Sequence, residues 1–146
     1  MQTGSLTPWH MMSGYKTPIS ITDIKDDGSA VLFSVFKEGG NLFIRNVSDG
    51  SDKLVLSRPG STVTGAWLSG EQQLLIHTIS SDALSSQLWV YDPASTELQT
   101  VAMPLPDLFI GTWRLSHDRK WLAFLTRKYG DFQSNGLWIA DLSGVR

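Results

Sequence analysis

The sequence predicts an all-β fold made of three tandem units, each with four short antiparallel strands. A six-residue pattern of a polar or small residue, leucine, an aromatic, a β-branched residue, a free position and then Asn or Asp occurs three times, at residues 41–46, 87–92 and 136–141. Its leucines, Leu42, Leu88 and Leu137, are 46 and 49 residues apart, which is the period of a repeated small sheet. Apolar runs of three to five residues are broken by Gly, Pro, Ser or Asp, and no 3.6-residue stripe persists.

The strands of each unit follow from these breaks, and the six-residue pattern forms the third strand of each. For the first unit we expect strands at 19–24, 31–33, 41–46 and 53–57, and for the second at 62–68, 74–76, 87–92 and 98–102. The third unit has strands at 109–115, 121–124 and 136–141, and residues 142–146 are too few for a fourth. Asn46, Asp92 and Asp141 end the third strands, and we expect them to cap the turns that follow.

A four-stranded unit of about 45 residues that repeats in tandem is typical of a β-propeller blade. We therefore divide the chain into blade 1 at 15–60, blade 2 at 61–106 and blade 3 at 107–146, the last without its outer strand. Residues 1–14 are expected to supply an outer strand that completes a neighbouring blade, and Pro8 suits such an edge position.

The third unit also carries a family resemblance. Residues 113–124, Trp-Arg-Leu-Ser-His-Asp-Arg-Lys-Trp-Leu-Ala-Phe, followed by Leu-Trp-Ile-Ala-Asp-Leu at 137–142, resemble the TolB-like propeller repeat, which is WD-repeat-like in its architecture. That repeat contains Ser, a Pro-Asp-Gly-Lys turn, Leu-Ala-Phe and Leu-Trp-Val-x-Asp-Leu, and it also occurs in prolyl oligopeptidase propellers and in sensory domains of bacterial regulators. His117 stands where the family usually has Pro, Gln72-Gln73 replace Gly-Lys, and Asp23-Ile24 replace Trp, so the chain resembles a diverged member.

Three blades leave an open arc, because known propellers have about four to eight. One hypothesis is a homodimer of six blades, in which the N-terminal strand of each copy, with Trp9 and Met11 as contacts, completes blade 3 of the other. The alternative is that the 146 residues are a fragment whose other blades lie elsewhere in a longer protein. The sequence leaves both open.

Composition excludes several classes of partner. The net charge is −2, with 12 basic and 14 acidic residues, so a nucleic-acid-binding surface is not expected. Cysteine is absent, which removes disulfides, thiolate nucleophiles and Cys-ligated zinc. The apolar runs are too short to span a membrane, and residues 1–14 do not resemble a secretory signal. The compartment stays open: cytoplasmic for a complete chain, periplasmic or extracellular for a piece of an exported one.

Loops at one mouth of the arc are the candidate interaction surface, because loops on rigid scaffolds usually carry function. In an up-and-down blade, the connections from strand two to three and from strand four to the next blade emerge on the same side. The candidate residues there are Lys37, Arg58, Asp82, Asp107, Arg127, Lys128, Tyr129, Asp131 and Phe132. The loop at 127–135 is the longest, and its two aromatics beside charges suit a protein contact, although they also fit packing onto the blade edge.

Neither a catalytic site nor a metal-binding site is expected. His10, His77 and His117 lie in unrelated contexts without a metal-ligand spacing, and no Gly-x-Ser-x-Gly elbow exists. Asp23, Asp26, Asp27 and Gly28 look like half of a calcium loop without its closing Glu, so we predict a plain tight turn, as at 49–52. Five tryptophans, Trp67, Trp89, Trp113, Trp121 and Trp138, lie in predicted strands and are expected to pack between blades.

The sequence thus favours a non-enzymatic, cofactor-free and metal-free module that binds a protein or a second copy of itself. Two alternatives remain: the propeller part of a prolyl oligopeptidase-type serine peptidase, although no hydrolase domain is present in these 146 residues, and a ligand-sensing propeller of a bacterial regulator.

Overall fold

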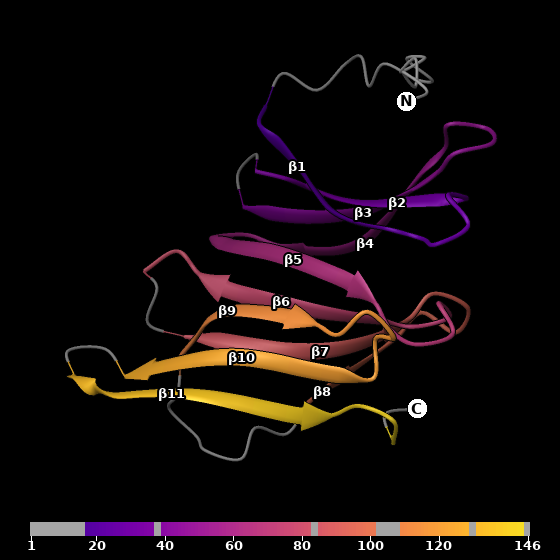
Figure 1. The fold of residues 1–146 in the computed structure, drawn as a ribbon. Helices are drawn as coiled ribbons and strands as arrows, with labels where there is room; N and C mark the ends of the chain where they lie inside the picture. Colours follow the sequence, from indigo (N-terminus) through magenta and orange to yellow (C-terminus); the bar gives the residue numbers. More distant parts are fainter. Residues whose placement is uncertain (1–16, 37–38, 83–84, 102–108, 129–130, 145–146) are drawn as a thin grey trace, which may run out of the picture.

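The fold is all β and contains three antiparallel sheets (Figure 1). The structure, a computed structural model, describes residues 17–36, 39–82, 85–101, 109–128 and 131–144. Its strands are β1 (Ile19–Ile24), β2 (Ala30–Val35), β3 (Gly40–Asn46), β4 (Asp52–Arg58), β5 (Ser61–Trp67), β6 (Leu74–Ser80), β7 (Ser86–Asp92), β8 (Glu97–Thr100), β9 (Phe109–Leu115), β10 (Trp121–Lys128) and β11 (Asp131–Asp141). The strands predicted between residues 19 and 141 are all present, with ends that differ by two residues or fewer for most of them.

Each sheet is an up-and-down meander. The first has the order β1-β2-β3-β4, the second β5-β6-β7-β8, and the third, in the described part of the chain, β9-β10-β11. Figure 1 shows the first sheet uppermost, with the second and third sheets below it and overlapping in this view. We call them blades 1, 2 and 3. They form an open stack and not a closed ring, as the sequence predicts.

The repeated pattern has the same register in all three blades. Leu42 of β3 pairs with Ser34 of β2, Leu88 pairs with His77, and Leu137 pairs with Leu125. Side chains alternate between the two faces of a strand, so each leucine and its partner point to the same face of their blade. We call this the forward face, because in blades 1 and 2 it packs against the next blade along the chain; the opposite face is the rear face.

Two apolar cores hold the blades together. The first joins blade 1, through Leu32 and Leu42, to the rear face of blade 2, through Val63, Trp67, Leu74 and Ile76. The second joins the forward face of blade 2, with Leu75, Leu88 and Val90, to the rear face of blade 3, with Ile110, Leu122 and Phe124. The large buried side chains thus lie between sheets, which is where the apolar area that stabilises the fold is removed from water.

Short polar turns connect the strands as expected. Asn46, Asp92 and Asp141 each accept a hydrogen bond at 2.8 Å from the backbone N–H two residues later. Asp27 and Asp49 do the same, and each is followed by a glycine at positive φ, Gly28 at 72° and Gly50 at 70°. The predicted capping and tight turns are therefore confirmed. Hydrogen bonds from the side chains of Ser29, Ser51 and Ser143, and then from their backbone N–H groups, lower the pKa of Asp27, Asp49 and Asp141, and the Ala94 N–H lowers that of Asp92.

Two details differ from the prediction. Trp121 does not pack between blades: it is 46% exposed, because it points to the forward face of blade 3, where the described chain places no further sheet. The segment predicted as the longest loop is largely strand, because β10 and β11 continue as a hairpin in which Lys128 pairs with Asp131. The strand proposed for residues 1–14, with Trp9 and Met11, lies outside the described residues and stays a prediction.

Candidate functional site

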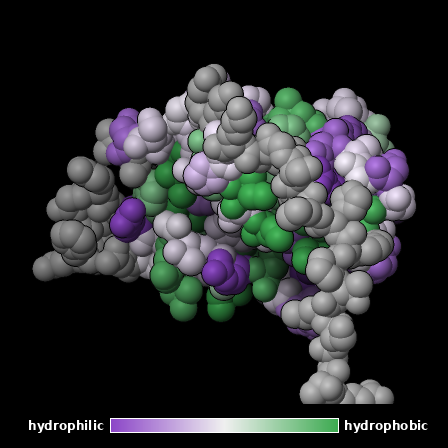
Figure 2. All heavy atoms as spheres, turned by 90° about the horizontal axis from the view of Figure 1, so that it is seen from above, coloured by the Kyte–Doolittle hydropathy of each residue, from purple (hydrophilic) through white to green (hydrophobic). Residues whose placement is uncertain are grey.

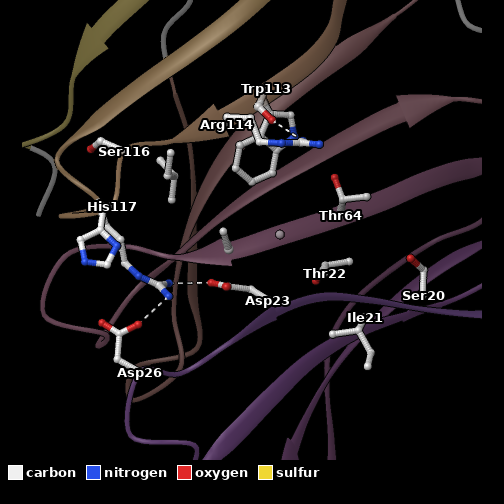
Figure 3. A pocket seen from close by; sticks show the side chains of 14 residues that line it. Ser20, Ile21, Thr22, Asp23, Asp26, Thr64, Trp113, Arg114, Ser116 and His117 are labelled. Carbon is white, nitrogen blue, oxygen red and sulfur yellow. Dashed lines mark hydrogen bonds and ion pairs between the residues drawn. The ribbon is translucent and has the colours of Figure 1, made fainter. Parts of the chain in front are cut away.

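A hollow of about 490 Å³ lies along the first strands of the three blades. Its lining comes from β1, β5 and β9 and from the turns that follow β1 and β9. Figure 3 shows Asp23, Asp26 and His117 at one end, and Thr22, Thr64 and Ser20 farther along the strands. Because β1, β5 and β9 come from different blades, the hollow exists only when the three blades are packed together.

The first strands of the blades, β1, β5 and β9, which we call the inner strands, face the hollow with their edges. Consecutive residues line it on each strand: Ser20 to Asp23 on β1, Thr64 to Ala66 on β5, and Trp113 to Leu115 on β9. A strand that turned one face to a cavity would contribute only every second residue. Each of these strands is also terminal in its sheet, so one of its edges pairs with no other described strand. The hollow is therefore bordered by backbone groups as well as by side chains.

Arg119 ties the three blades together at the turn end of the hollow. Its Nη1 donates to Asp23 Oδ2 at 2.6 Å and to the Trp67 carbonyl at 3.0 Å. Its Nη2 donates to Asp26 Oδ1 at 3.1 Å and to the Ile24 carbonyl at 3.3 Å. Burial works against the charged guanidinium, but its bonds to Asp23 outweigh that effect and raise the pKa of Arg119. One side chain of blade 3 thus bonds to blade 1 and blade 2.

The carboxylates opposite Arg119 are also fixed by the backbone and by neighbouring turns. Asp23 Oδ2 accepts a second bond, at 2.8 Å, from the Trp67 N–H. The Asp26 N–H donates to Glu71 Oε1 at 2.6 Å. Glu71 and Arg119 take the same place in the turns of blades 2 and 3 that Gly28 takes in blade 1, and all three have positive φ, at 53°, 59° and 72°. The expectation that Gln72-Gln73 replace the Gly-Lys of the repeat was therefore wrong by one residue, because Glu71-Gln72 stand there. The two non-glycine residues at this place thus both send their side chains to the turn of blade 1.

The adjacent Ser116 and His117 do not form a catalytic pair. The Ser116 hydroxyl donates to Asp118 Oδ1 at 2.6 Å and accepts from the Trp121 N–H at 3.0 Å, so it closes its own turn. A serine nucleophile needs a hydrogen-bonded base that is itself oriented by a third group. The bonds of Ser116 provide no such base.

The described part of the chain also bears on metal binding and on membrane insertion. No group of three His, Asp or Glu side chains there could hold a metal ion. The same described residues form no helix with the length and apolar character needed to cross a bilayer.

Three of the predicted interaction residues, Arg58, Asp82 and Arg127, lie at the opposite ends of the strands. The Arg58 guanidinium is 4.8 Å from the Trp89 ring centre, and that of Arg127 is 4.7 Å from the Phe109 ring centre. Asp82 accepts a hydrogen bond at 2.5 Å from Ser80 Oγ. Arg58 and Arg127 are thus engaged in cation–π contacts, and nothing brings these three residues together into one site.

For the other predicted interaction residues, the structure gives only the strand or nothing. Lys128, Asp131 and Phe132 belong to β10 and β11. Lys37, Asp107 and Tyr129 lie outside the described residues, so the surface proposed for this mouth stays a prediction.

The sequence reading missed Arg119 as a site residue. One signal was available, because Arg119 follows His117-Asp118 at the place where the TolB-like turn has glycine. A large charged side chain at a position that favours positive φ needs a compensating contact. The partners of Arg119 could not be found this way, since Asp23 and Asp26 are 96 and 93 residues away in the chain.

The fold and this hollow define the class: an open, three-bladed part of a β-propeller. No protein-family model matches the chain, and no curated protein matches it either. Solved structures do match. TolB from Acinetobacter baumannii superimposes with a TM-score of 0.68 at 17% identity, over 93% of this chain and 32% of TolB.

Two peptidase structures match in the same way. Oligopeptidase B from Trypanosoma brucei has a TM-score of 0.66 at 9% identity, over 94% of this chain and 19% of the other. The β-propeller domain of the Trilobed protease from Pyrococcus furiosus has a TM-score of 0.61 at 15% identity, over 86% of this chain and 39% of the other. The TolB-like propeller fold is thus confirmed, and this chain spans about a third of the length of TolB.

Proposed function

We propose that this chain is a non-enzymatic binding module and that its ligand is an extended protein segment held in the inner-strand hollow. The observation that carries the proposal is the edge-on arrangement of β1, β5 and β9, with consecutive residues of each strand lining the same space. Unpaired strand edges recognise extended peptides through main-chain hydrogen bonds, and nearby side chains then give specificity.

The side chains around the hollow fit such a ligand. Arg114 is exposed there and Ser20 and Thr64 offer hydroxyls, so both charged and neutral hydrogen-bonding groups are available. The Trp113 ring lies in the same lining and adds apolar surface. A peptide carries backbone donors and acceptors at regular intervals together with apolar side chains, which matches this mixture better than a uniformly charged polymer would.

The absence of enzymatic activity is part of the proposal. Ser116, the one serine next to a histidine in the lining, is used in its turn, and the Arg119 cluster pairs its charges internally. A nucleophile or base needs a side chain that is free to meet substrate. These groups are therefore better suited to holding the blades than to proton transfer.

The proposal is tested by selecting peptides that bind the protein. Random peptides displayed on phage are selected, synthesised and measured by isothermal titration. Thr64→Trp fills the hollow and is expected to weaken binding at least tenfold, whereas Thr62→Trp, at an exposed position on the same strand, should change it less than twofold. Failure to enrich any peptide, or equal effects of the two variants, would contradict a ligand site in the hollow.

The peptidase matches favour a second candidate, in which this propeller part accompanies a hydrolase domain and controls access to it. A longer reading frame that encodes such a domain, with peptidase activity that falls when the blades are removed, would support it. Peptide binding by the isolated blades without any linked hydrolase would favour the first candidate.

A further inference from the structure

We propose that the forward face of blade 3 binds the rear face of blade 1 of a second copy of this chain, so that two copies close a ring of six blades. Six lies within the range of about four to eight blades in which propellers close, and three does not. The proposal does not depend on what the hollow binds.

The forward face of blade 3 is apolar and open. Leu42, Leu88 and Leu137 occupy the same place in the repeat, yet they are 0%, 1% and 69% exposed. Ile139, the equivalent of the buried Val90, is 70% exposed, and Leu125 is also half exposed. The residues that bury themselves against the next blade in blades 1 and 2 are thus present in blade 3, where the described chain supplies no next blade.

This face also has a hollow of about 420 Å³, which borders Leu125, Gly136 and Leu137. In blade 1, the corresponding end of β3 is covered by the next blade so closely that a Cβ on Gly40 would lie 2.7 Å from Val63 Cγ2. At this end of a forward face, the inner strand of the following blade therefore packs against the third strand.

The rear face of blade 1 provides the complementary surface. The aromatic of the repeat, Trp89 in blade 2 and Trp138 in blade 3, packs against the preceding blade. Its equivalent in blade 1 is Phe43, which stacks on Phe33 with ring centres 5.4 Å apart. Blade 1 thus keeps the aromatic with which a blade contacts its predecessor, although the described chain contains no predecessor.

Phe33 itself is 0% exposed, and the Arg45 guanidinium lies 5.9 Å from its ring centre, so contact on this face falls to the exposed aliphatic side chains around the rings. Ile24 and Leu54, which pair with Val31 and Phe43, are 48% and 50% exposed on this face. Figure 2 looks down on blade 1 from the side away from blade 2, and apolar atoms gather in the middle of that view. An apolar patch with a polar border is typical of a protein contact.

A second copy fits because both faces occur on every chain. We call the contact between two successive blades a joint. Both joints within the described chain place the rear face of one blade on the forward face of the blade before it. Each copy therefore has one rear face and one forward face that no described blade covers. Docking two copies head to tail uses all four leftover faces and gives a two-fold symmetric ring, whereas an unrelated partner would have to reproduce the blade surface.

The new joint differs from the internal joints in one respect. Ser34 Oγ donates to the Val63 carbonyl across the first joint, and the His77 ring is hydrogen-bonded to the Ile110 backbone across the second. The equivalent residue in blade 3 is Leu125, which has no hydrogen-bonding group. The joint between copies therefore depends on apolar contact, and we expect it to dissociate on dilution while the internal joints persist.

The test measures molar mass by light scattering with two variants that change one face each. Leu137→Asp with Ile139→Asp places charge on the forward face, and Ile24→Asp with Leu54→Asp places charge on the rear face. Thr62→Asp with Thr100→Asp is the control, at exposed positions of blade 2, away from both docking faces. Circular dichroism of each variant verifies that the sheets are intact.

We expect twice the 16.2 kDa of one chain for the unchanged protein and the control, and 16.2 kDa for each face variant alone. Mixing the two face variants should restore the doubled mass, because one joint of the mixed pair remains unchanged. A monomer at concentrations near 100 µM, a dimer unaffected by either face variant, or open chains of many copies would each overturn the two-copy ring.

Discussion

Leu88 of blade 2 and Leu137 of blade 3 hold the same place in the repeat but have opposite surroundings. Leu88 is 1% exposed between two sheets, and Leu137 is 69% exposed. Their own strands pair in the same register, Leu88 with His77 and Leu137 with Leu125. The comparison teaches that burial of a propeller leucine is decided by the adjacent blade and not by the sheet to which it belongs.

The largest effect should separate these two leucines directly. Leu88→Ala removes a buried side chain and leaves a cavity, so we expect a loss of about 2–5 kcal/mol in the free energy of unfolding. Leu137→Ala should change it by less than about 0.5 kcal/mol when the chain is monomeric. Urea unfolding is measured with both substitutions made in the Ile24→Asp, Leu54→Asp background, which removes any contribution from dimers. Similar losses for the two would show that blade 3 is covered within one chain.

Acid should weaken the joint that contains His77 and leave the open face unchanged. Burial lowers the pKa of His77 from 6.5 to about 4. Between these values the unfolded chain binds a proton that the folded chain does not, so His77 contributes a loss of stability as the pH falls from 6.5 towards 4. The shift corresponds to about 3 kcal/mol at its full extent.

His77→Gln removes this titration and serves as the comparison. The fall in unfolding free energy between pH 7 and pH 4.5 should be smaller for His77→Gln than for the unchanged protein. Equal pH profiles for the two proteins would mean that folding does not lower the pKa of His77. Leu125→Gln, at the equivalent place in blade 3, is expected to have no such effect.

Two glycines sharpen the same contrast. A Cβ on Gly40 would lie 2.5 Å from the Ser61 carbonyl oxygen and 2.7 Å from the Val63 nitrogen, so Gly40→Ala must push blades 1 and 2 apart. We expect a loss of about 1–3 kcal/mol. Gly111 of blade 3 has open space, its nearest atom being Phe109 Cε1 at 3.9 Å, and Gly111→Ala should stabilise by up to about 1 kcal/mol. Thermal unfolding of both variants checks the order, and a tolerated Gly40→Ala would contradict the close packing of this joint.

The smallest effect concerns the two carboxylates that Arg119 binds. Asp23 is 20% exposed and bonded at 2.6 Å, so a double-mutant cycle between Asp23→Asn and Arg119→Lys should give a coupling of about 1 kcal/mol. Asp26 is 77% exposed, and its coupling to Arg119 should stay below about 0.5 kcal/mol. Raising the salt concentration should reduce the Asp26 coupling more. Equal couplings would mean that Arg119 does not anchor blade 3 mainly through Asp23.

Local features of the fold were predictable from the sequence because they depend on neighbours in the chain. The strand pattern around Leu42, Leu88 and Leu137 and the turns after Asn46 and Asp92 follow from alternation and from hydrogen bonds that span two residues. The exposure of Trp121 was not predictable in this way, since its residue type suits a joint and only the missing neighbour leaves it open.

The candidate site was less predictable, because it is assembled across blades. The Arg119 cluster joins groups more than 90 residues apart, and the hollow depends on the edges of three strands that only packing brings together. A periodic pattern gives the contents of each blade. It does not give the direction in which a single turn residue such as Arg119 reaches, which decides where the site lies.

The left-handed turn position shared by Gly28, Glu71 and Arg119 has a consequence for engineering. An averaged repeat, concatenated to make long artificial propellers, would place glycine at all three positions because glycine adopts that backbone conformation with least strain. Such an array would gain ideal turns and lose both side chains that reach to the first blade. Its blades would still bury apolar side chains between their sheets, but they would lack the polar bonds that fix one blade relative to the next, so uniformity would be obtained at the expense of a defined curvature.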